Sequence, residues 1–338
     1  MWSEDQLNEM LSFPSPSLVG DMEKIHGDLM ILGAGGKMGP TLSVLAQRAR
    51  KASGTPGRVI AVSRFSDPEV AGYLRANGVD LITLDLLSDE AMDVLPDVPH
   101  IIYMAGRKFG TKASEAQTWA MNAALPAFVS RRFRKSRIVV FSSGNIYPLV
   151  SQMDGGCTED RSPAPIGEYA MSCLARERVF EHASRADGCP VLLYRLNYAV
   201  DLRYGILHDL AVKILNGEPI SLRTSAFNCV WQGYANEVAI RCLQLAASPA
   251  AILNVTGPET ISVSFASDLL GQYLGRKPVF IDEPTGYAYL SQAGRCFEQY
   301  GYPSVTLNEM IRWQAEWLLS GGRSLDKPTH FEEQEGQF

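Results

Sequence analysis

The chain has 338 residues, of which 46% are hydrophobic, and its formal net charge is −6 at pH 7. This composition supports a sizeable core and excludes general disorder. It lacks the basic footprint of a nucleic-acid-binding protein, and no apolar run approaches the ~18 residues needed to span a bilayer. The segment Met1–Met10 has no basic or apolar region typical of a signal peptide. We therefore expect a cytoplasmic protein with neither nucleic acid nor membrane as a partner.

The cysteine and histidine patterns predict neither disulfides nor a metal site. The six cysteines include no Cys-x-x-Cys pair, and the five histidines are scattered along the chain. A chain of this length does not need disulfides to stabilise its core, and metal sites require clustered ligands. A reducing compartment fits this usage.

Strands and helices alternate through the first part of the chain. Strands are expected at Leu29–Leu32, Arg58–Val62, Asp80–Leu84, His100–Met104, Ile138–Phe141 and Val191–Tyr194. Helices are expected at Ser3–Leu11, Lys37–Ala52, between Asp67 and Gly78, from Ser88, at Ser114–Lys135 and at Ile166–Ala186. This alternation predicts an α/β protein with a Rossmann-type, doubly wound parallel sheet.

Beyond Asn197 the pattern becomes irregular and predicts a smaller C-terminal α/β cap. Its helices are expected near Ile206–Asn216, Tyr234–Ala247, Val263–Leu274 and Leu307–Leu319. We expect a helical extension at 1–27, a dinucleotide-binding domain at 28–197, a substrate-binding cap at 198–321 and a disordered polar tail at 322–338. Part of the segment 198–260 can return to the dinucleotide-binding domain.

A glycine-rich turn follows the first predicted strand and opens a helix. It reads Gly33-Ala-Gly-Gly36-Lys37-Met38-Gly39. Gly33 permits a tight turn, Gly36 lets the backbone approach a pyrophosphate at the helix N-terminus, and Gly39 permits close helix–strand packing. The string alone is a weak signal, but its strand–turn–helix context predicts a dinucleotide site.

The ends of two further strands extend the predicted cofactor site. Asp85 and Leu86 follow the third strand, and Met104, Ala105 and Gly106 follow the fourth. Because ligands in such sheets bind beyond the carboxyl ends of the strands, we expect these residues to contact the dinucleotide.

The end of the second strand bears on the choice between NAD and NADP. An acidic residue there commonly binds the adenosine ribose 2′-hydroxyl of NAD. Here Val62-Ser63-Arg64-Phe65 contains no acid. Arg64 either binds a 2′-phosphate, stacks on adenine or is simply solvated. We expect NADP or NAD as the cofactor, with a modest preference for NADP.

From Leu29 to Leu319 the chain resembles the extended short-chain dehydrogenase/reductase superfamily, that is, the NAD(P)-dependent epimerase/dehydratase family. The motifs that carry this resemblance are Gly33–Gly39, Asp85, Asn122, Ser143 within Phe141–Tyr147, Tyr169–Cys173, Arg195–Asn197, Leu253–Gly257 and the helix with Trp313 and Trp317.

The resemblance implies roles for several residues, with one departure. Tyr169 would be the general acid/base, Ser143 would orient the substrate oxygen, and Asn122 would belong to both the catalytic and the cofactor-binding set. Tyr169 would also contact the cofactor. The family's lysine four residues after the tyrosine lowers the phenol pKa, which is otherwise near ~10. Cys173 occupies that position here.

Three interpretations of the missing lysine stay open. Another cation replaces it, with Arg107 and Lys108 in the loop after the fourth strand as candidates. Alternatively, Tyr169 acts only as a neutral hydrogen-bond donor. In the third interpretation the site is catalytically inactive and binds the dinucleotide for another purpose. Cys173 belongs to the predicted catalytic set because it occupies the lysine position, but it is expected to fill space rather than act as a nucleophile.

The C-terminal half informs the substrate class. Family members that act on nucleotide-diphosphate sugars usually carry an arginine before a cap helix, where it pairs with the diphosphate. The corresponding run Asn228–Glu237 has none. Either an insertion displaces this residue or the substrate lacks a diphosphate, which we favour. The expected substrate-binding residues are Arg107, Lys108, Ser143, Asn145, Asn197 and Tyr198. Arg195, Arg203 and Tyr204 either assist them or are structural.

We therefore expect an NAD(P)-dependent oxidoreductase or epimerase that acts on a sugar, sugar acid or polyol. One alternative is a nucleotide-diphosphate-sugar epimerase or dehydratase, and another is a non-catalytic dinucleotide-sensing protein. The resemblance also implies a homodimer, formed through the long helices at Ser114–Lys135 and Ile166–Ala186.

Overall fold

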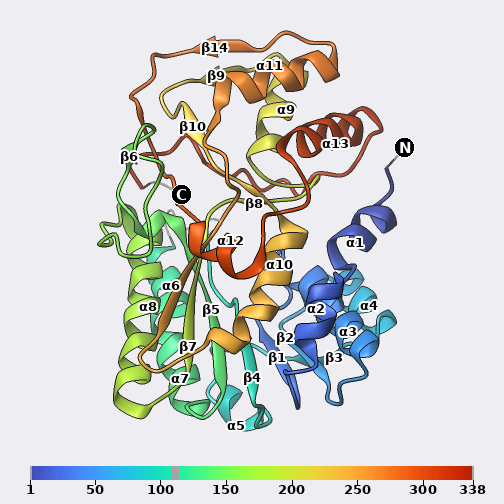
Figure 1. Ribbon diagram of the computed structural model, residues 1–338, viewed down its shortest axis with the longest axis vertical. Coiled ribbons are helices and arrows are strands. Elements are labelled where there is room, and N and C mark those ends of the chain that lie inside the picture. Colours follow the sequence, from blue (N-terminus) through green and yellow to red (C-terminus); the bar gives the residue numbers. More distant parts are fainter. Residues whose placement is uncertain (1, 109–113, 337–338) are drawn as a thin grey trace.

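A seven-stranded parallel sheet forms the centre of the computed structural model, which describes residues 2–108 and 114–336 (Figure 1). In spatial order its strands are β12 (Ala251–Val255), β7 (Val191–Leu196), β5 (Arg137–Ser143), β4 (His100–Tyr103), β1 (Leu29–Leu32), β2 (Val59–Ser63) and β3 (Asp80–Thr83). Every pairing between neighbours is parallel. The predicted fold class, a Rossmann-type sheet with a smaller C-terminal cap, is confirmed.

The apolar strands of the sheet are buried on both faces. In β1, Leu29 and Ile31 join one core, whereas Met30 and Leu32 join the core on the opposite face. This alternation explains why β1 reads as an uninterrupted apolar run. The first face is covered by α2 (Pro16–Met22), α3 (Gly39–Ser53) and α10 (Gln232–Arg241). The second is covered by α7 (Leu125–Arg132) and α8 (Gly167–Asp187).

The strand order reverses around β1, which lies between β4 and β2. In open α/β sheets this switch point leaves a crevice beyond the carboxyl ends of the strands. The glycine turn follows β1 and leads into α3 at this edge. The fold therefore brings the cofactor motif to the place where such sheets bind ligands.

The cap lies beyond one end of the sheet and has its own apolar core (Figure 1). Its helices are α9 (Ile206–Asn216), α11 (Val263–Leu274) and α13 (Leu307–Leu319). Short strand pairs accompany them: β9 (Pro219–Ser221) with β14 (Val279–Ile281), and β10 (Ala226–Phe227) with β13 (Ile261–Ser262). Because β12 belongs to the central sheet, part of the segment 198–260 lies with the sheet and not with the cap.

The remaining elements are short and connect these parts. They are α1 (Glu4–Ser12), α4 (Pro68–Ala76), α5 (Ala91–Val94), α12 (Gly294–Tyr300), β6 (Val150–Ser151), β8 (Ala199–Val200), β11 (Val230–Trp231) and β15 (Tyr287–Ala288). Short 3₁₀ turns form at Gly144–Ile146 and Cys242–Leu245. The N-terminal extension contains α2 in addition to the predicted first helix, since Pro16 opens this helix instead of only ending the one before it.

The predicted continuous helix at Ser114–Lys135 is interrupted. It consists of α6 (Glu115–Trp119), a π-helical turn at Ala120–Ala124 and α7, which ends at Arg132. Pro126, which cannot donate a backbone hydrogen bond, lies in the first turn of α7. Such π-helical turns often occur at functional sites, and this one carries Asn122.

The C-terminal segment 322–336 packs against the cap, which contradicts the predicted disorder. Phe331 joins the apolar core of the cap. Thr329 is fully buried and bonds the Asp209 carboxylate through its backbone N–H, at 2.8 Å, and through its hydroxyl, at 2.6 Å. The last two residues of the predicted tail, 337–338, lie outside the described residues.

Two general expectations can be examined over residues 2–108 and 114–336. None of the helices there combines the length and the apolar character that a membrane span requires. Within the same residues, no cluster of three or more histidine, cysteine or acidic side chains could hold a metal ion.

Candidate active site

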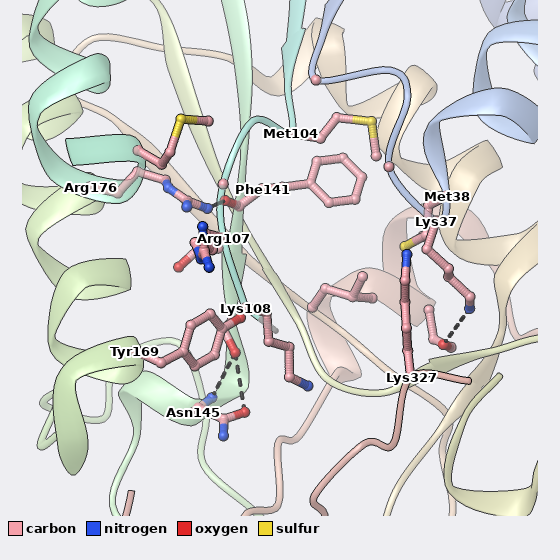
Figure 2. A pocket seen from close by; sticks show the side chains of 18 of the residues that line it. Lys37, Met38, Met104, Arg107, Lys108, Phe141, Asn145, Tyr169, Arg176 and Lys327 are labelled. Carbon is pink, nitrogen blue, oxygen red and sulfur yellow. Dashed lines mark hydrogen bonds between the residues drawn. The ribbon is translucent and has the colours of Figure 1, made fainter. Parts of the chain in front are cut away.

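A cavity of about 570 Å³ lies at the carboxyl ends of the central strands, between the sheet and the cap (Figure 2). Fifteen of the predicted site residues line it: Gly33, Gly36, Lys37, Met38, Arg64, Asp85, Met104, Gly106, Arg107, Lys108, Ser143, Asn145, Tyr169, Asn197 and Tyr198. Leu86 and Ala105 line an adjoining cavity of about 250 Å³ that shares the glycine turn. Gly39, Asn122 and Cys173 line neither cavity.

The glycine turn has the geometry of a dinucleotide cradle. Gly33 has φ +88°, and a β-carbon there would lie 2.6 Å from the backbone of Ala105. A β-carbon at Gly39 would collide with the carbonyl of Ala34, so this glycine permits close packing at the start of α3. At Gly36 only the Gly33 carbonyl, at 3.5 Å, would be within reach of a β-carbon. The space beside Gly36 is therefore open to the cavity, as the approach of a pyrophosphate requires.

We predict that Gly36→Val folds but loses dinucleotide affinity at least ~100-fold, because the side chain would occupy the place of the pyrophosphate. Calorimetric titration with NAD(H) and NADP(H) measures the effect, and circular dichroism reports folding. Undiminished affinity in a folded variant would remove the turn from the cofactor site.

Tyr169 and Ser143 meet in the cavity from different elements. Tyr169 lies in the first turn of α8, and Ser143 is the last residue of β5. Burial raises the pKa of the Tyr169 phenol well above its ordinary value, while the charge of Arg176 and a hydrogen bond with Ser143 act in the opposite direction. The Ser143 hydroxyl also donates to Asn145 Oδ1, at 3.2 Å, and accepts from the Asn145 backbone N–H, at 3.1 Å. These contacts fix the serine hydroxyl beside the phenol.

Cys173 lies one helical turn after Tyr169 and is 1% exposed. Burial raises the pKa of its thiol, so the group is neutral at neutral pH and brings no charge to the phenol. Since Cys173 lines neither cavity, it is part of the packing under Tyr169. Its side chain also hydrogen-bonds with that of Tyr169, so its place in the catalytic set stays a prediction.

Lys108 approaches the phenol from the loop after β4. Its Nζ lies 5.9 Å from the centroid of the Tyr169 ring and 5.8 Å from that of Tyr198. Burial lowers the pKa of Lys108 to about 8, with Cys173 and Asp209 acting in the opposite direction. The ammonium group is thus still charged at neutral pH, near the group that the missing lysine would serve.

Asn122 holds the scaffold of the site together. From the π-helical turn its Oδ1 accepts from the Arg107 backbone N–H, at 2.8 Å, and from Arg176 Nη2, at 2.7 Å. Its Nδ2 donates to the Arg107 carbonyl, at 3.0 Å, and to Ser172 Oγ, at 2.9 Å. All of its hydrogen-bonding groups are therefore committed to the loop after β4 and to α8. This supports a positioning role, and the place of Asn122 in the catalytic and cofactor-binding sets stays a prediction.

Two arginines that were expected either to assist substrate binding or to be structural are buried in ion pairs. Arg195 Nη2 lies 2.8 Å from Glu177 Oε2, and Arg203 Nη2 lies 3.1 Å from Asp201 Oδ2. Neither arginine lines the cavity, whereas Tyr198 and Tyr204 do. Asn197 also reaches the cavity, although its Nδ2 donates to Asn228 Oδ1 at 2.6 Å.

Sequence reasoning missed several lining residues, namely Gln117, Phe141, Arg176 and Lys327. Arg176 lies seven residues after Tyr169, which places both on one face of α8. Its Nη1 donates to the Phe141 carbonyl at 2.7 Å. Helical periodicity could have identified Arg176, but nothing in the polar tail distinguishes Lys327.

A model of the NAD dependent epimerase/dehydratase family matches residues 29–221, more than half of the chain. The chain belongs to this family. The resemblance to extended short-chain dehydrogenases/reductases is thereby confirmed, and NAD is the cofactor that the family uses. No curated protein sequence matches the chain.

Solved structures share the fold over most of the chain. UDP-glucuronic acid 4-epimerase from Bacillus cereus, in complex with UDP-glucuronic acid and NAD, matches with a TM-score of 0.72 and 16% identity over 87% of this chain and 99% of its own. MoeE5 in complex with UDP-glucose and NAD gives 0.67 and 22% over 87% and 99%. The dTDP-glucose 4,6-dehydratase from Bacillus anthracis str. Ames gives 0.72 and 12% over 87% and 96%. At these identities the likeness concerns the fold.

Proposed function

We propose that this family member is an oxidoreductase or epimerase that transfers hydride between nicotinamide and a hydroxyl or carbonyl carbon of a sugar-like small molecule. The observation that carries the proposal is the meeting of Tyr169 and Ser143 in the same cavity as the glycine turn. A non-catalytic dinucleotide sensor would not need an acid/base pair in that position.

Each part of the site has a distinct role in the proposed reaction. The Gly33–Gly39 turn holds the pyrophosphate at the N-terminus of α3, and bound NAD supplies the hydride acceptor or donor. Tyr169 takes the proton from a substrate hydroxyl, or returns it to a carbonyl oxygen, at its phenol oxygen. Ser143, held by Asn145, orients that substrate oxygen. Lys108 supplies the positive charge that stabilises the phenolate.

The alternative of a nucleotide-diphosphate-sugar substrate has less support from the cap. The run Asn228–Glu237, which has no arginine, contributes Gln232 and Asn236, and both donate to Thr41 Oγ1, at 3.0 and 3.1 Å. These residues therefore pack against α3 and do not line the cavity. Arg223 is exposed and also lies outside it. This arrangement favours a substrate without a diphosphate.

The function is tested with a panel of sugars, sugar acids, sugar phosphates, polyols and nucleotide sugars, with reduced-nicotinamide absorbance as the readout. We expect turnover with at least one member that lacks a nucleotide. Turnover confined to nucleotide sugars would favour the alternative, and tight dinucleotide binding without any turnover would favour the sensor.

The free, buried cysteines fit our further proposal of a cytoplasmic location.

Arg64 leads to a prediction about the cofactor. It lines both cavities, and its Nη1 lies 4.0 Å from Asp85 Oδ2. The expected preference for NADP stays a prediction beside the family's use of NAD. Arg64→Ala should lower NADP(H) affinity about tenfold, since a charge-assisted hydrogen bond contributes ~1.5–3 kcal/mol, and leave NAD(H) affinity within about twofold. A wild-type preference for NAD that the substitution leaves unchanged would contradict this role.

We also propose a homodimer through α7 and α8. Phe128 on α7 and Met171 on α8 are 53% and 45% exposed, although both are large and apolar. Burying such side chains at an interface is favourable. Sedimentation velocity at micromolar concentration should show a dimer, and Phe128→Glu should shift it to a monomer with unchanged circular dichroism. A monomeric wild-type protein would refute the proposal.

A further inference from the structure

Arg176 places a buried positive charge at the wall of the large cavity. It lies in the middle of α8, is 6% exposed and lines the cavity. Among residues 2–108 and 114–336, no acidic side chain forms an ion pair with it, in contrast to the buried pairs of Arg195 and Arg203. A buried charge without an opposite charge beside it is costly, and such groups often mark functional sites.

Neutral groups hold the guanidinium of Arg176. Its Nη1 donates to the Phe141 carbonyl of β5 at 2.7 Å, and its Nη2 donates to Asn122 Oδ1 in the π-helical turn at 2.7 Å. A β-carbon at Gly106 would collide with Nη2, so the guanidinium also lies against the loop after β4. Figure 2 shows it extending from α8 toward Phe141. These partners fix the position of the guanidinium without neutralising its charge.

The same bonds lead to both members of the pair formed by Ser143 and Tyr169. The β5 carbonyl that accepts from Nη1 belongs to the residue two positions before Ser143. Asn122 Nδ2 donates to Ser172 Oγ at 2.9 Å, and that hydroxyl donates to the Tyr169 carbonyl at 2.8 Å. The arginine also follows Tyr169 by seven residues, about two helical turns, and therefore lies on the same face of α8. It is thus connected to the backbone on both sides of the acid/base pair.

The charge of Arg176 acts on the phenol. Burial is the main cause of the raised pKa of Tyr169, and the charge of Arg176 acts in the opposite direction because it favours the phenolate. It acts in the same way against the raised pKa of the buried Cys173 thiol. Among the described residues, the titratable or charged groups beside the phenol are Cys173 and Arg176 on α8 and Lys108 from the loop after β4.

The two cations differ in how their charge depends on pH. Burial lowers the pKa of Lys108 to about 8, so its charge is lost above that pH. An arginine guanidinium stays protonated over the whole working range of an enzyme. Arg176 is therefore still charged at the high pH values at which Tyr169 ionises most readily and Lys108 is neutral.

We propose that Arg176 is a positioning residue that supplies the permanent positive charge for Tyr169, three residues after Cys173, where the family's lysine would stand. During oxidation the phenolate takes the proton of the substrate hydroxyl while hydride passes from the same carbon to nicotinamide, which leaves a carbonyl. In the reverse direction the phenol returns that proton. Arg176 keeps its own protons throughout and stabilises the phenolate, and Lys108 adds a second charge that depends on pH. The inference rests on the proposed function, because it assigns a further residue of the same site.

The test compares Arg176→Gln with Arg176→Lys in the NAD-saturated full chain. Glutamine keeps hydrogen-bond donors but has no charge, whereas lysine keeps the charge. The probe is the panel member that the wild type oxidises fastest, and reduced-nicotinamide absorbance is followed from about pH 6 to about pH 10. We expect Arg176→Gln to lower the rate about tenfold and to move the profile about one unit to higher pH, because a phenol pKa raised by one unit leaves tenfold less phenolate. Arg176→Lys should retain most of the wild-type rate at neutral pH.

The pH dependence separates the two cations. The lower rate of Arg176→Gln should persist over the whole range, whereas that of Lys108→Met should disappear above about pH 8. Arg178→Gln is the matched control, because it removes an exposed arginine of the same helix that pairs with Glu181; it should change neither the rate nor the profile. Circular dichroism and calorimetric titration with NAD establish that each variant is folded and loaded.

The inference is overturned if folded Arg176→Gln keeps the wild-type rate and profile, or if Arg176→Lys loses as much activity as Arg176→Gln. Arg176→Met is a second neutral variant that takes the place of Arg176→Gln if the latter does not fold. Failure of the wild type to turn over any member of the panel would instead refute the proposed function.

Discussion

Tyr169→Phe is expected to lower the rate of hydride transfer by ~10²–10⁴-fold, the range that general acid–base catalysis contributes. The substitution removes the phenol oxygen and keeps the ring that packs beside Lys108 and Cys173. NAD affinity should stay within a few-fold of the wild type, because the glycine turn is untouched. Rates are measured by reduced-nicotinamide absorbance with the substrate that the panel identifies.

The raised pKa of Tyr169 also predicts how the reaction rate depends on pH. Because burial places the phenol pKa well above its ordinary value, the group is protonated at neutral pH. It is then ready to act as an acid on a carbonyl, whereas oxidation of a hydroxyl requires the phenolate. The rate of substrate oxidation should therefore rise with pH. A Tyr169→Phe protein that turns over normally would show that the tyrosine only packs or contacts ribose.

Lys108→Met should lower turnover and move the pH–rate profile to higher pH. A cation within ~4–6 Å can shift the pKa of a neighbouring group by roughly 1–3 units, and Lys108 Nζ lies 5.9 Å from the Tyr169 ring centroid. Its charge favours the phenolate, so its loss raises the phenol pKa. Since the pKa of Lys108 is about 8, the wild type should turn over faster than Lys108→Met below that pH, and this difference should disappear above it.

The conservative variant separates charge from shape. Lys108→Arg keeps the positive charge and should retain most of the wild-type profile, whereas Lys108→Met should not. NAD affinity is measured in parallel and should stay nearly constant in both variants. A fully active Lys108→Met protein with an unmoved profile would rule out Lys108 as the replacement for the missing lysine and would leave Arg176, whose charge lowers the pKa of Tyr169, as the remaining candidate.

Most strands of the sheet could be predicted because they are short apolar runs buried on both faces, whereas the edge strand β3 is only partly buried. Leu29–Leu32 was predicted with its observed bounds, since glycine and polar residues mark both ends. The interrupted helix around Asn122 was not predicted, because a π-helical turn has no reliable sequence signal and the Asn122 side chain within it bonds the distant residues Arg107 and Arg176. Packing of the C-terminal segment depends on single residues, Thr329 and Phe331, within a polar stretch.

Motif residues of the site could be predicted because the backbone fixes their spacing. The glycine turn and the pair of Ser143 and Tyr169 line one cavity as expected. Residues whose roles depend on tertiary partners could not be assigned. Arg195 and Arg203 were candidates for substrate contacts until their buried ion pairs were seen.

The central claim is that Tyr169 transfers the substrate proton during hydride transfer and that Lys108 supports it in place of the missing lysine. Single-turnover mixing of the NAD-loaded protein with an identified substrate tests this claim most directly. We predict a rapid reduced-nicotinamide signal in the wild type and no signal in Tyr169→Phe on the same timescale. In Lys108→Met the signal should be slower, and its rate should reach its maximum at a higher pH. Equal signals in all three proteins would contradict it.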